Sequence, residues 1–491
     1  MLHQRQHPEH YGDHMDNDLC LKPASEQAAL IRSRELGSRE LLDAYLARVE
    51  ALNVPLNAVC RLDIRRAEEL ADEADRAALR DDWRGPLHGL PITIKDAIET
   101  EGIRSTGGAE ALADHVPEHD APAVAVLKRA GAIVFGKTNL SEWSGDVQAF
   151  NDLFGVTNNP WDLSRTPGGS SGGAAAAVAA GLTSFELGTD IGGSIRIPSA
   201  FCGVFGHKPS FGLIPTYGYL DAVGGGSTES DVNCFGPIAR SAADLDLLLG
   251  VLAGPAPDRA VAWNVELPWP DSFDVSGLRV AAWIDDPAIA VDTEVAAIYR
   301  SAADALERAG ARVERTARPD IDVAAAVKAG GDLVGVAASA GLSDEMLTAI
   351  AARTDGAYGE ALMSHVEWMR RDRRRAETRH RWARFFERWD VLLCPVTLTP
   401  AFEHMFEGSF ATRTIEVNGV RRAYEELCSW ACLIGAAYLP STSAPVGFTD
   451  SGLPVGIQVV GPYLHDRTTI AVAGWLTELT KGYRVPPLAA P

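Results

Sequence analysis

Residues 168–181 read GGSSGGAAAAVAAG, two serines between two glycine pairs with an alanine-rich run directly after them. The run from Ala174 to Ala180 predicts a buried, tightly packed helix, because alanine favours helix and lets backbones approach closely. The serines therefore precede the start of this helix. Three interpretations fit them at this point: a phosphate cradle, a nucleophile elbow, or part of a less common catalytic site.

Outward from this stretch, helices alternate with short apolar strands. No tract typical of a linker divides the chain, so one large α/β unit is expected. Residues 24–80 are expected to be mainly helical, with Ser38 as the N-cap of a helix over 38–52. Residues 145–167 are expected to form a long loop, and GGSIRIP a turn after the strand at 184–190. Further strands are expected at 90–96, 132–138, 278–284, 311–317, 391–396 and 453–461, and further helices at 123–131 and 293–309.

The bulk composition excludes several classes of protein. The 491 residues carry a net charge of −21, which argues against nucleic acid as a partner, because phosphate contacts need a basic face. The seven cysteines are scattered without a C-x-x-C pair, and this odd number predicts a reducing, cytoplasmic location. Residues 1–20 are polar and are expected to form a disordered tail, not a signal peptide. No run of 18 apolar residues predicts a membrane span.

The segment 366–388 contains nine arginines. It is expected to form the solvated face of an amphipathic helix, with an anionic-ligand site as the alternative.

The phosphate interpretation has a second apparent match in GAIVFGKT (131–138), which fits the G-x-x-x-x-G-K-[ST] pattern. A phosphate loop needs a flexible backbone whose N–H groups converge on the ligand. Here the four intervening residues are themselves a predicted strand. The match with Lys137 is therefore interpreted as accidental.

The nucleophile-elbow interpretation rests on Gly168, Ser170 and Gly172, which match G-x-S-x-G. Such an elbow follows a strand. The preceding residues, NNPWDLSRTP, contain two prolines and several turn formers, so no strand is expected there. The pattern does not favour this interpretation.

Three blocks in a set order favour the third interpretation. Lys95 lies in GLPITIKD, Ser170 follows 75 residues later, and Ser194 lies another 24 residues on, in GTDIGGSIRIP. With LKRAGAIVFGKTNLSEW, CGVFGHKPSFGLIP and GLPVGIQVVGPYLHDRTT, they resemble the amidase signature family over roughly residues 25–485. The form of the third block with isoleucine at position 191 is similar to that of the fatty-acid-amide-hydrolase branch of this family.

The resemblance implies one α/β domain over residues 21–491, a large mixed sheet covered by helices on both faces. It implies an amidase that forms an acyl-enzyme on Ser194, with Lys95 as general base and Ser170, after a cis peptide bond, as proton relay. A serine hydroxyl needs such a base within hydrogen-bond reach. Lysine can act as one when burial keeps it neutral. No metal or organic cofactor is implied.

The resemblance also implies the substrate-binding groups. The backbone N–H groups of Ile191, Gly192 and Gly193 would stabilise the oxyanion, and glycine allows the close approach this requires. Ser144 would lie in the substrate channel. Ser171 is expected to support the serine loop, and Asp190 and Arg196 are expected to form a structural ion pair.

Several alternatives stay open for the activity. The same triad could hydrolyse a carbamate or an ester. The chain could instead be the glutamine-hydrolysing subunit of a tRNA-dependent amidotransferase, although no arginine and aspartate for glutamine can be identified in residues 320–430. If Lys95 is not the base, His207 is the next candidate. The expected ligand is a small-molecule amide, and the chain could form a homodimer.

Overall fold

The alanine-rich run forms helix α5 (Gly172–Ala179), and every one of its residues is buried. In the computed structural model, residues 19–270, 274–339, 345, 347–348 and 363–490 are described. The tail expected over residues 1–20 lies outside the described residues except for its last two. These belong to the short 3-10 helix η1 (Leu19–Leu21), in which Cys20 is buried.

The core of the fold is an eleven-stranded mixed sheet with the strand order β1-β3-β2-β6-β8-β7-β14-β15-β11-β9-β10. Its strands are β1 (Val59–Leu62), β2 (Pro91–Lys95), β3 (Ile133–Thr138), β6 (Glu186–Asp190), β7 (Phe205–Lys208), β8 (Cys234–Ala239), β9 (Arg279–Ala282), β10 (Arg312–Glu314), β11 (Val391–Pro395), β14 (Ser441–Phe448) and β15 (Pro454–Val460). Strand β2 runs parallel to both β3 and β6, while β6 and β8 are antiparallel. Two small sheets pair β4 (Phe150–Asn151) with β5 (Gly155–Val156), and β12 (Thr414–Val417) with β13 (Val420–Ala423).

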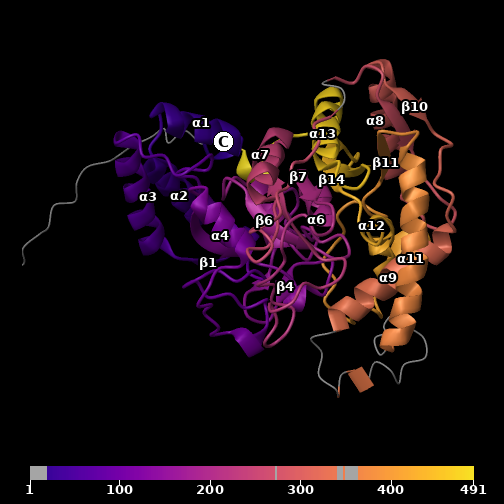
Figure 1. The fold of residues 1–491 in the computed structure, drawn as a ribbon, viewed down its shortest axis with the longest axis horizontal. Coiled ribbons are helices and arrows are strands. Elements are labelled where there is room, and N and C mark those ends of the chain that lie inside the picture. The colour runs from indigo at the N-terminus through magenta and orange to yellow at the C-terminus, as the bar shows by residue number, and fades with distance from the viewer. Residues whose placement is uncertain (1–18, 271–273, 340–344, 346, 349–362, 491) are drawn as a thin grey trace, which may run out of the picture.

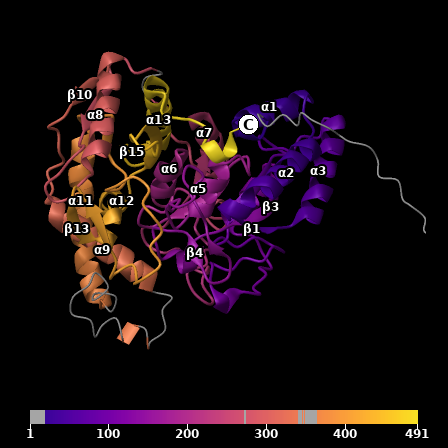
Figure 2. The same ribbon diagram turned by 180° about the vertical axis from the view of Figure 1, so that it is seen from behind.

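Helices flank the sheet on both sides. They are α1 (Ala24–Ser33), α2 (Ser38–Leu56), α3 (Ile64–Leu79), α4 (Pro122–Arg129), α5, α6 (Arg196–Cys202), α7 (Ala242–Leu252), α8 (Thr293–Arg308), α9 (Val323–Ser339), α11 (His365–Phe386), α12 (Ser429–Gly435) and α13 (Asp466–Thr480). Further 3-10 helices are η2 (Glu110–Leu112), η3 (Glu142–Ser144), η5 (Tyr424–Cys428) and η6 (Pro487–Ala489). Figure 2 shows α5 and α6, which pack together, in front of the central strands. None of the described helices combines the length and apolar character needed to cross a bilayer.

The two ends of the described chain lie on the same side of the molecule. Figure 1 shows α1–α3 at one end of the fold, α8, α9 and α11 at the other, and the C-terminus beside α1. Arg48 of α2 donates a hydrogen bond to the carbonyl oxygen of Ala489 at 2.5 Å. The last residues thus close onto the first helices, and one large α/β domain, as expected, contains the whole sheet.

The local predictions are confirmed in most places and wrong in four. Strands β4 and β5 pair within residues 145–167, the segment expected to be a loop. Strand β1 interrupts the region expected to be helical. The segment expected to be a turn continues into helix α6, which begins at Arg196. Helix α2 begins at Ser38 with Gly37 as its N-cap, and the backbone N–H of Ser38 donates to Asp75 of α3 at 2.6 Å. A distant carboxylate therefore caps this helix in place of the local serine.

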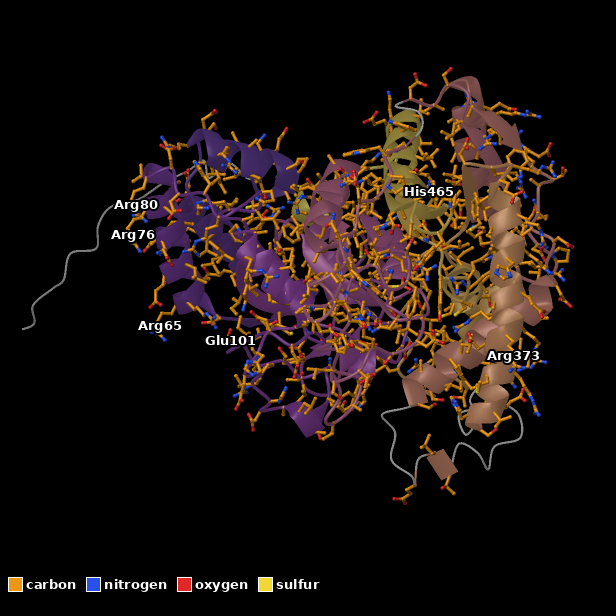
Figure 3. The ribbon with its side chains drawn as sticks, in the orientation of Figure 1. Arg65, Arg76, Arg80, Glu101, Arg373 and His465 are labelled. Atoms are coloured by element: carbon orange, nitrogen blue, oxygen red, sulfur yellow. The ribbon has the colours of Figure 1, made fainter. Side chains whose placement is uncertain are left out.

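The arginine-rich segment forms α11, but its arginines are not all solvated. Arg373 points away from the fold into solvent (Figure 3). Arg375, by contrast, is buried and binds Asp231 and Asp372, and Arg371 binds Asp332 of α9. The expectation of a solvated face is correct for one side of the helix only. The other side attaches α11 to its neighbours through ion pairs.

Candidate active site

The side chain of Lys95 is fully buried at the end of β2, which is the third strand from one edge of the sheet. Its Nζ lies 2.6 Å from Ser170 Oγ and 2.7 Å from Thr189 Oγ1. Burial lowers the pKa of Lys95 from 10.5 to about 7, against the opposing effects of Asp190 and Glu186. The amine is therefore available as a proton acceptor near neutral pH.

Ser170 precedes helix α5 and follows a cis peptide bond to Gly169. A side chain at Gly169 would lie only 2.4 Å from the carbonyl oxygen of Gln148, so this position requires glycine. Ser171 supports the loop, as expected: its hydroxyl donates to the carbonyl oxygen of Thr189 at 3.2 Å. The Ser171 N–H also donates to the carbonyl oxygen of Ser194 at 3.2 Å, which joins the two serine-bearing segments.

Asp190 organises the loop between β6 and α6. It forms a fully buried bidentate ion pair with Arg196, at 2.7 Å and 3.0 Å, which confirms the expected structural pair. Its carboxylate also accepts hydrogen bonds from the N–H groups of Gly193 and Ile195, at 2.9 Å and 3.0 Å. Although burial raises it, Arg196 holds the pKa of Asp190 below its usual range. The loop that carries Ser194 is thus built around a permanent negative charge.

Ser194 lies half-buried at the centre of this loop, where its hydroxyl makes no hydrogen bond to any described residue. The N–H groups of Ile191, Gly192 and Ser194 likewise have no hydrogen-bond partner among the described residues. Gly193 differs, because its N–H is bonded to Asp190. The loop consequently offers Ile191, Gly192 and Ser194 as donors for an oxyanion, with Gly193 as the point that attaches the loop to Asp190.

Two side chains that the sequence did not single out complete the centre. Thr189 accepts a hydrogen bond from Lys95 and lies directly before Asp190. Burial raises the pKa of Tyr219 to about 12, while the hydroxyls of Ser144 and Thr189 lower it, which places Tyr219 near both. Only the position of Thr189 at the end of a predicted strand could have indicated its role. Nothing in the local sequence indicated Tyr219.

Ser144 lies in η3 with a left-handed backbone at φ 56°, and its buried hydroxyl has no hydrogen-bond partner among the described residues. Nearby, Asp146 is bound by Arg413 and accepts a 2.9 Å hydrogen bond from the hydroxyl of Tyr424. This carboxylate therefore has its own partners within the protein. Ser144 remains a neutral polar group beside Tyr219.

Residues of helices α9 and α12 pack against Gly192 and Gly193 of the Ser194 loop. A Cβ placed on Gly192 would lie 3.5 Å from Val334 and 3.7 Å from the sulfur of Cys432, and one on Gly193 would lie 2.9 Å from Ala431. This side of the loop is therefore lined by apolar and neutral groups.

The structure brings Lys95 and the two serine loops together and separates the other candidates from them. Lys137 is buried in strand β3, where its Nζ donates to Ile98 O, Thr100 Oγ1 and Ser105 Oγ. It lies in a strand, as predicted, and not in a loop whose N–H groups could converge on a phosphate. His207 is buried between Asp466 and Thr442, at 3.1 Å and 2.9 Å, and is not directed at the serines.

Comparison with known proteins defines the class. The Amidase family model matches residues 40–470, and the chain belongs to the amidase signature family. It is therefore an amidase-type enzyme that acts on carbon–nitrogen bonds. Among curated relatives, a subunit of the glutamyl-tRNA(Gln) amidotransferase of Moorella thermoacetica is 34% identical over 96% of this chain and 99% of its own length. The corresponding subunit of Geobacillus thermodenitrificans is 32% identical over 94% and 98%.

Solved structures extend the comparison to hydrolases. A bacterial aryl acylamidase of the amidase signature family superposes with a TM-score of 0.81 at 25% identity, covering 96% of this chain and 99% of its own. A 6-aminohexanoate cyclic dimer hydrolase superposes with a TM-score of 0.78 at 26% identity, covering 96% and 100%. Fatty acid amide hydrolase, at 22% identity and a TM-score of 0.76 over 94% and 86%, shares the fold.

Proposed function

We propose that the protein is an amide hydrolase in which Ser194 is the nucleophile, Ser170 the proton relay and Lys95 the general base. The observation that carries the proposal is the 2.6 Å contact between Lys95 Nζ and Ser170 Oγ in a fully buried site. A charged ammonium would be poorly solvated there, so the neutral amine can accept a proton.

The reaction then runs through two proton transfers along the same path. Neutral Lys95 takes the proton of the Ser170 hydroxyl, and Ser170 takes that of Ser194, whose oxygen attacks the amide carbon. The loop N–H groups of Ile191, Gly192 and Ser194 stabilise the negative oxygen that forms. Ser170 then returns a proton to the departing nitrogen, and water hydrolyses the acyl-enzyme by the same route.

The supporting features favour a hydrolase of simple amides over the glutamine-hydrolysing role in an amidotransferase. Recognition of free glutamine requires charged partners for its ammonium and carboxylate groups. Arg413, within the region 320–430, binds Asp146 and the carbonyl oxygens of Glu407 and Gly408, so it is already engaged inside the protein. Val334, Ala431 and Cys432 beside the Ser194 loop suit an apolar or aryl group.

A second candidate, glutamine hydrolysis within an amidotransferase, is favoured by the curated relatives, which are named as amidotransferase subunits and match nearly the full chain. The two are distinguished by assaying the purified chain alone against acyl p-nitroanilides, aryl amides, carbamates, esters and glutamine. A hydrolase cleaves the anilides without a partner. Turnover confined to glutamine, or dependent on an added partner protein, supports the second candidate.

The roles of the serines are tested with a fluorophosphonate probe, followed by peptide mass spectrometry. The adduct should lie on Ser194, Ser194→Ala should abolish labelling, and Ser170→Ala should slow it without moving the adduct. An adduct on Ser170 would reverse the assignment. The proposed substrate is a small-molecule amide. The net charge of −21 is in keeping with the absence of a nucleic-acid partner, and the seven scattered cysteines are in keeping with a cytoplasmic site of action. The proposed assembly is a homodimer.

A further inference from the structure

A hydrogen bond crosses the strand that carries Lys95. Strand β2 lies between β3 and β6, with Thr93 paired to Glu186 of β6 and Lys95 paired to Thr138 of β3. Paired residues on neighbouring strands direct their side chains to the same face of the sheet. All four of these side chains therefore lie on one face of the sheet. Across β2, Thr138 Oγ1 donates a hydrogen bond to Glu186 Oε1 at 2.7 Å. The side chain of Glu186 therefore reaches over β2, and its carboxyl group lies beside the stem of Lys95.

This carboxyl group is fully buried and only partly satisfied. Glu186 Oε2 and the neighbouring Thr93 Oγ1 form no hydrogen bond of good geometry with any described residue, although the Thr93 hydroxyl lies close enough to lower the pKa of Glu186. Burying a carboxylate whose oxygen lacks a well-formed hydrogen bond costs more free energy than burying the protonated acid. The position thus holds a group that can change its charge next to the amine that acts as base.

We propose that Glu186 is a positioning residue that acts through Lys95: its charge determines how readily the amine gives up its proton, and so the pH range in which Ser194 is activated. This inference rests on the proposed function. Glu186 does not contact the reacting atoms, and Ser170 and Thr189 remain the direct partners of Lys95.

Of the two carboxyl groups that act on Lys95, Glu186 is the one whose charge can change near neutral pH. Two carboxyl groups, Asp190 and Glu186, raise the pKa of Lys95 against the effect of burial. Asp190 is held ionised by Arg196, so its contribution is constant over the neutral range. Burial raises the pKa of Glu186 to about 7, in the range in which Lys95 itself titrates. The two protons therefore leave in coupled steps.

The neighbouring elements supply one more charge. This charge is Lys137 on β3, which lowers the pKa of Glu186. Successive residues of a strand face opposite sides of the sheet, so Lys137 lies on the opposite side from Thr138. Asp96 and Cys60 lie beside Lys137 on that side. Strand β8 presents Ile238 opposite Glu186, and Cys234 only at the far end of the pairing. Helix α5, which covers this face, contributes only glycine, alanine and valine.

The test is the pH dependence of Ser194 labelling by a fluorophosphonate and of kcat/KM on an anilide. In Glu186→Gln the negative charge is gone, so Lys95 loses its proton more easily, and the rising limb should move to lower pH by about one unit. A uniform loss of rate with an unmoved midpoint would mean that Glu186 is only structural, and would overturn the proposal.

A matched pair of variants keeps the test decisive if Glu186→Gln does not fold. Thr138→Val removes the donor that favours the ionised carboxyl, and should move the limb in the same direction by a smaller amount. Thr138→Ser retains the hydroxyl and should keep the wild-type midpoint. Equal midpoints in the Val and Ser variants would refute the role of the bond.

The wild type and Lys95→Ala separate this inference from the proposed function. If the label is not on Ser194, or if Lys95→Ala keeps the rising limb, the triad assignment itself is wrong and this inference falls with it. If both behave as expected and only the Glu186 and Thr138 variants leave the midpoint unmoved, the triad stands and only this inference is wrong.

Discussion

Replacing Lys95 by methionine should change how the stability of the protein depends on pH. Methionine has a similar length but no charge, so Lys95→Met removes a group whose pKa is about 7 in the folded protein against 10.5 ordinarily. Between these two values the unfolded chain holds the lysine proton and the folded protein does not. Wild-type stability therefore rises with pH through this window, and it falls as pH decreases toward 7.

The magnitude follows from the two pKa values. Between pH 9 and pH 7 the wild type should lose about 2 kcal/mol of unfolding free energy relative to Lys95→Met. The same calculation for Lys137, whose pKa burial lowers to about 8, yields about 1 kcal/mol for Lys137→Met. The exposed Lys481→Met is the control for losing one lysine, and should give no difference.

Urea unfolding followed by tryptophan fluorescence at the two pH values measures these differences directly. Using the change between pH values for each variant removes the pH-independent cost of the hydrogen bonds lost to Ser170 and Thr189. A wild-type curve that runs parallel to that of Lys95→Met would refute the argument, because Lys95 would then be protonated alike in the folded and unfolded states.

Three further outcomes are expected. Gly193→Ala should lower kcat by roughly 10²-fold, because φ is 119° and a Cβ would lie 2.8 Å from Ile197 and 2.9 Å from Ala431; unchanged kcat would mean that the loop tolerates the shift. Arg196→Met should destabilise the protein by about 3–5 kcal/mol, because Asp190 becomes a buried unpaired charge, whereas the solvent-directed Arg373→Met should leave the Tm unchanged. The wild type should show no ATP turnover; turnover that Lys137→Ala abolishes would restore the phosphate interpretation.

The sequence by itself predicted the family and the candidate triad, because the three blocks are local strings at a set separation. It also predicted most strands and helices, including α5 and β6, because apolar periodicity and alanine content act over a few neighbouring residues. It could not predict the cap of α2, because Asp75 reaches Ser38 from another helix. The sequence did not predict the short strand β1 for a similar reason: its pairing with β3 outweighs the helical preference of the surrounding residues.

Only the tertiary structure decided the electrostatics of the site. The pKa of Lys95 depends on burial by elements far apart in the chain, and the bond from Thr138 to Glu186 exists only because β2 lies between β3 and β6. The placement of Tyr219 near Ser144 and the burial of Arg375 likewise follow from long-range packing. Strand order and register bring these groups together, and neither is encoded in a local pattern of side chains.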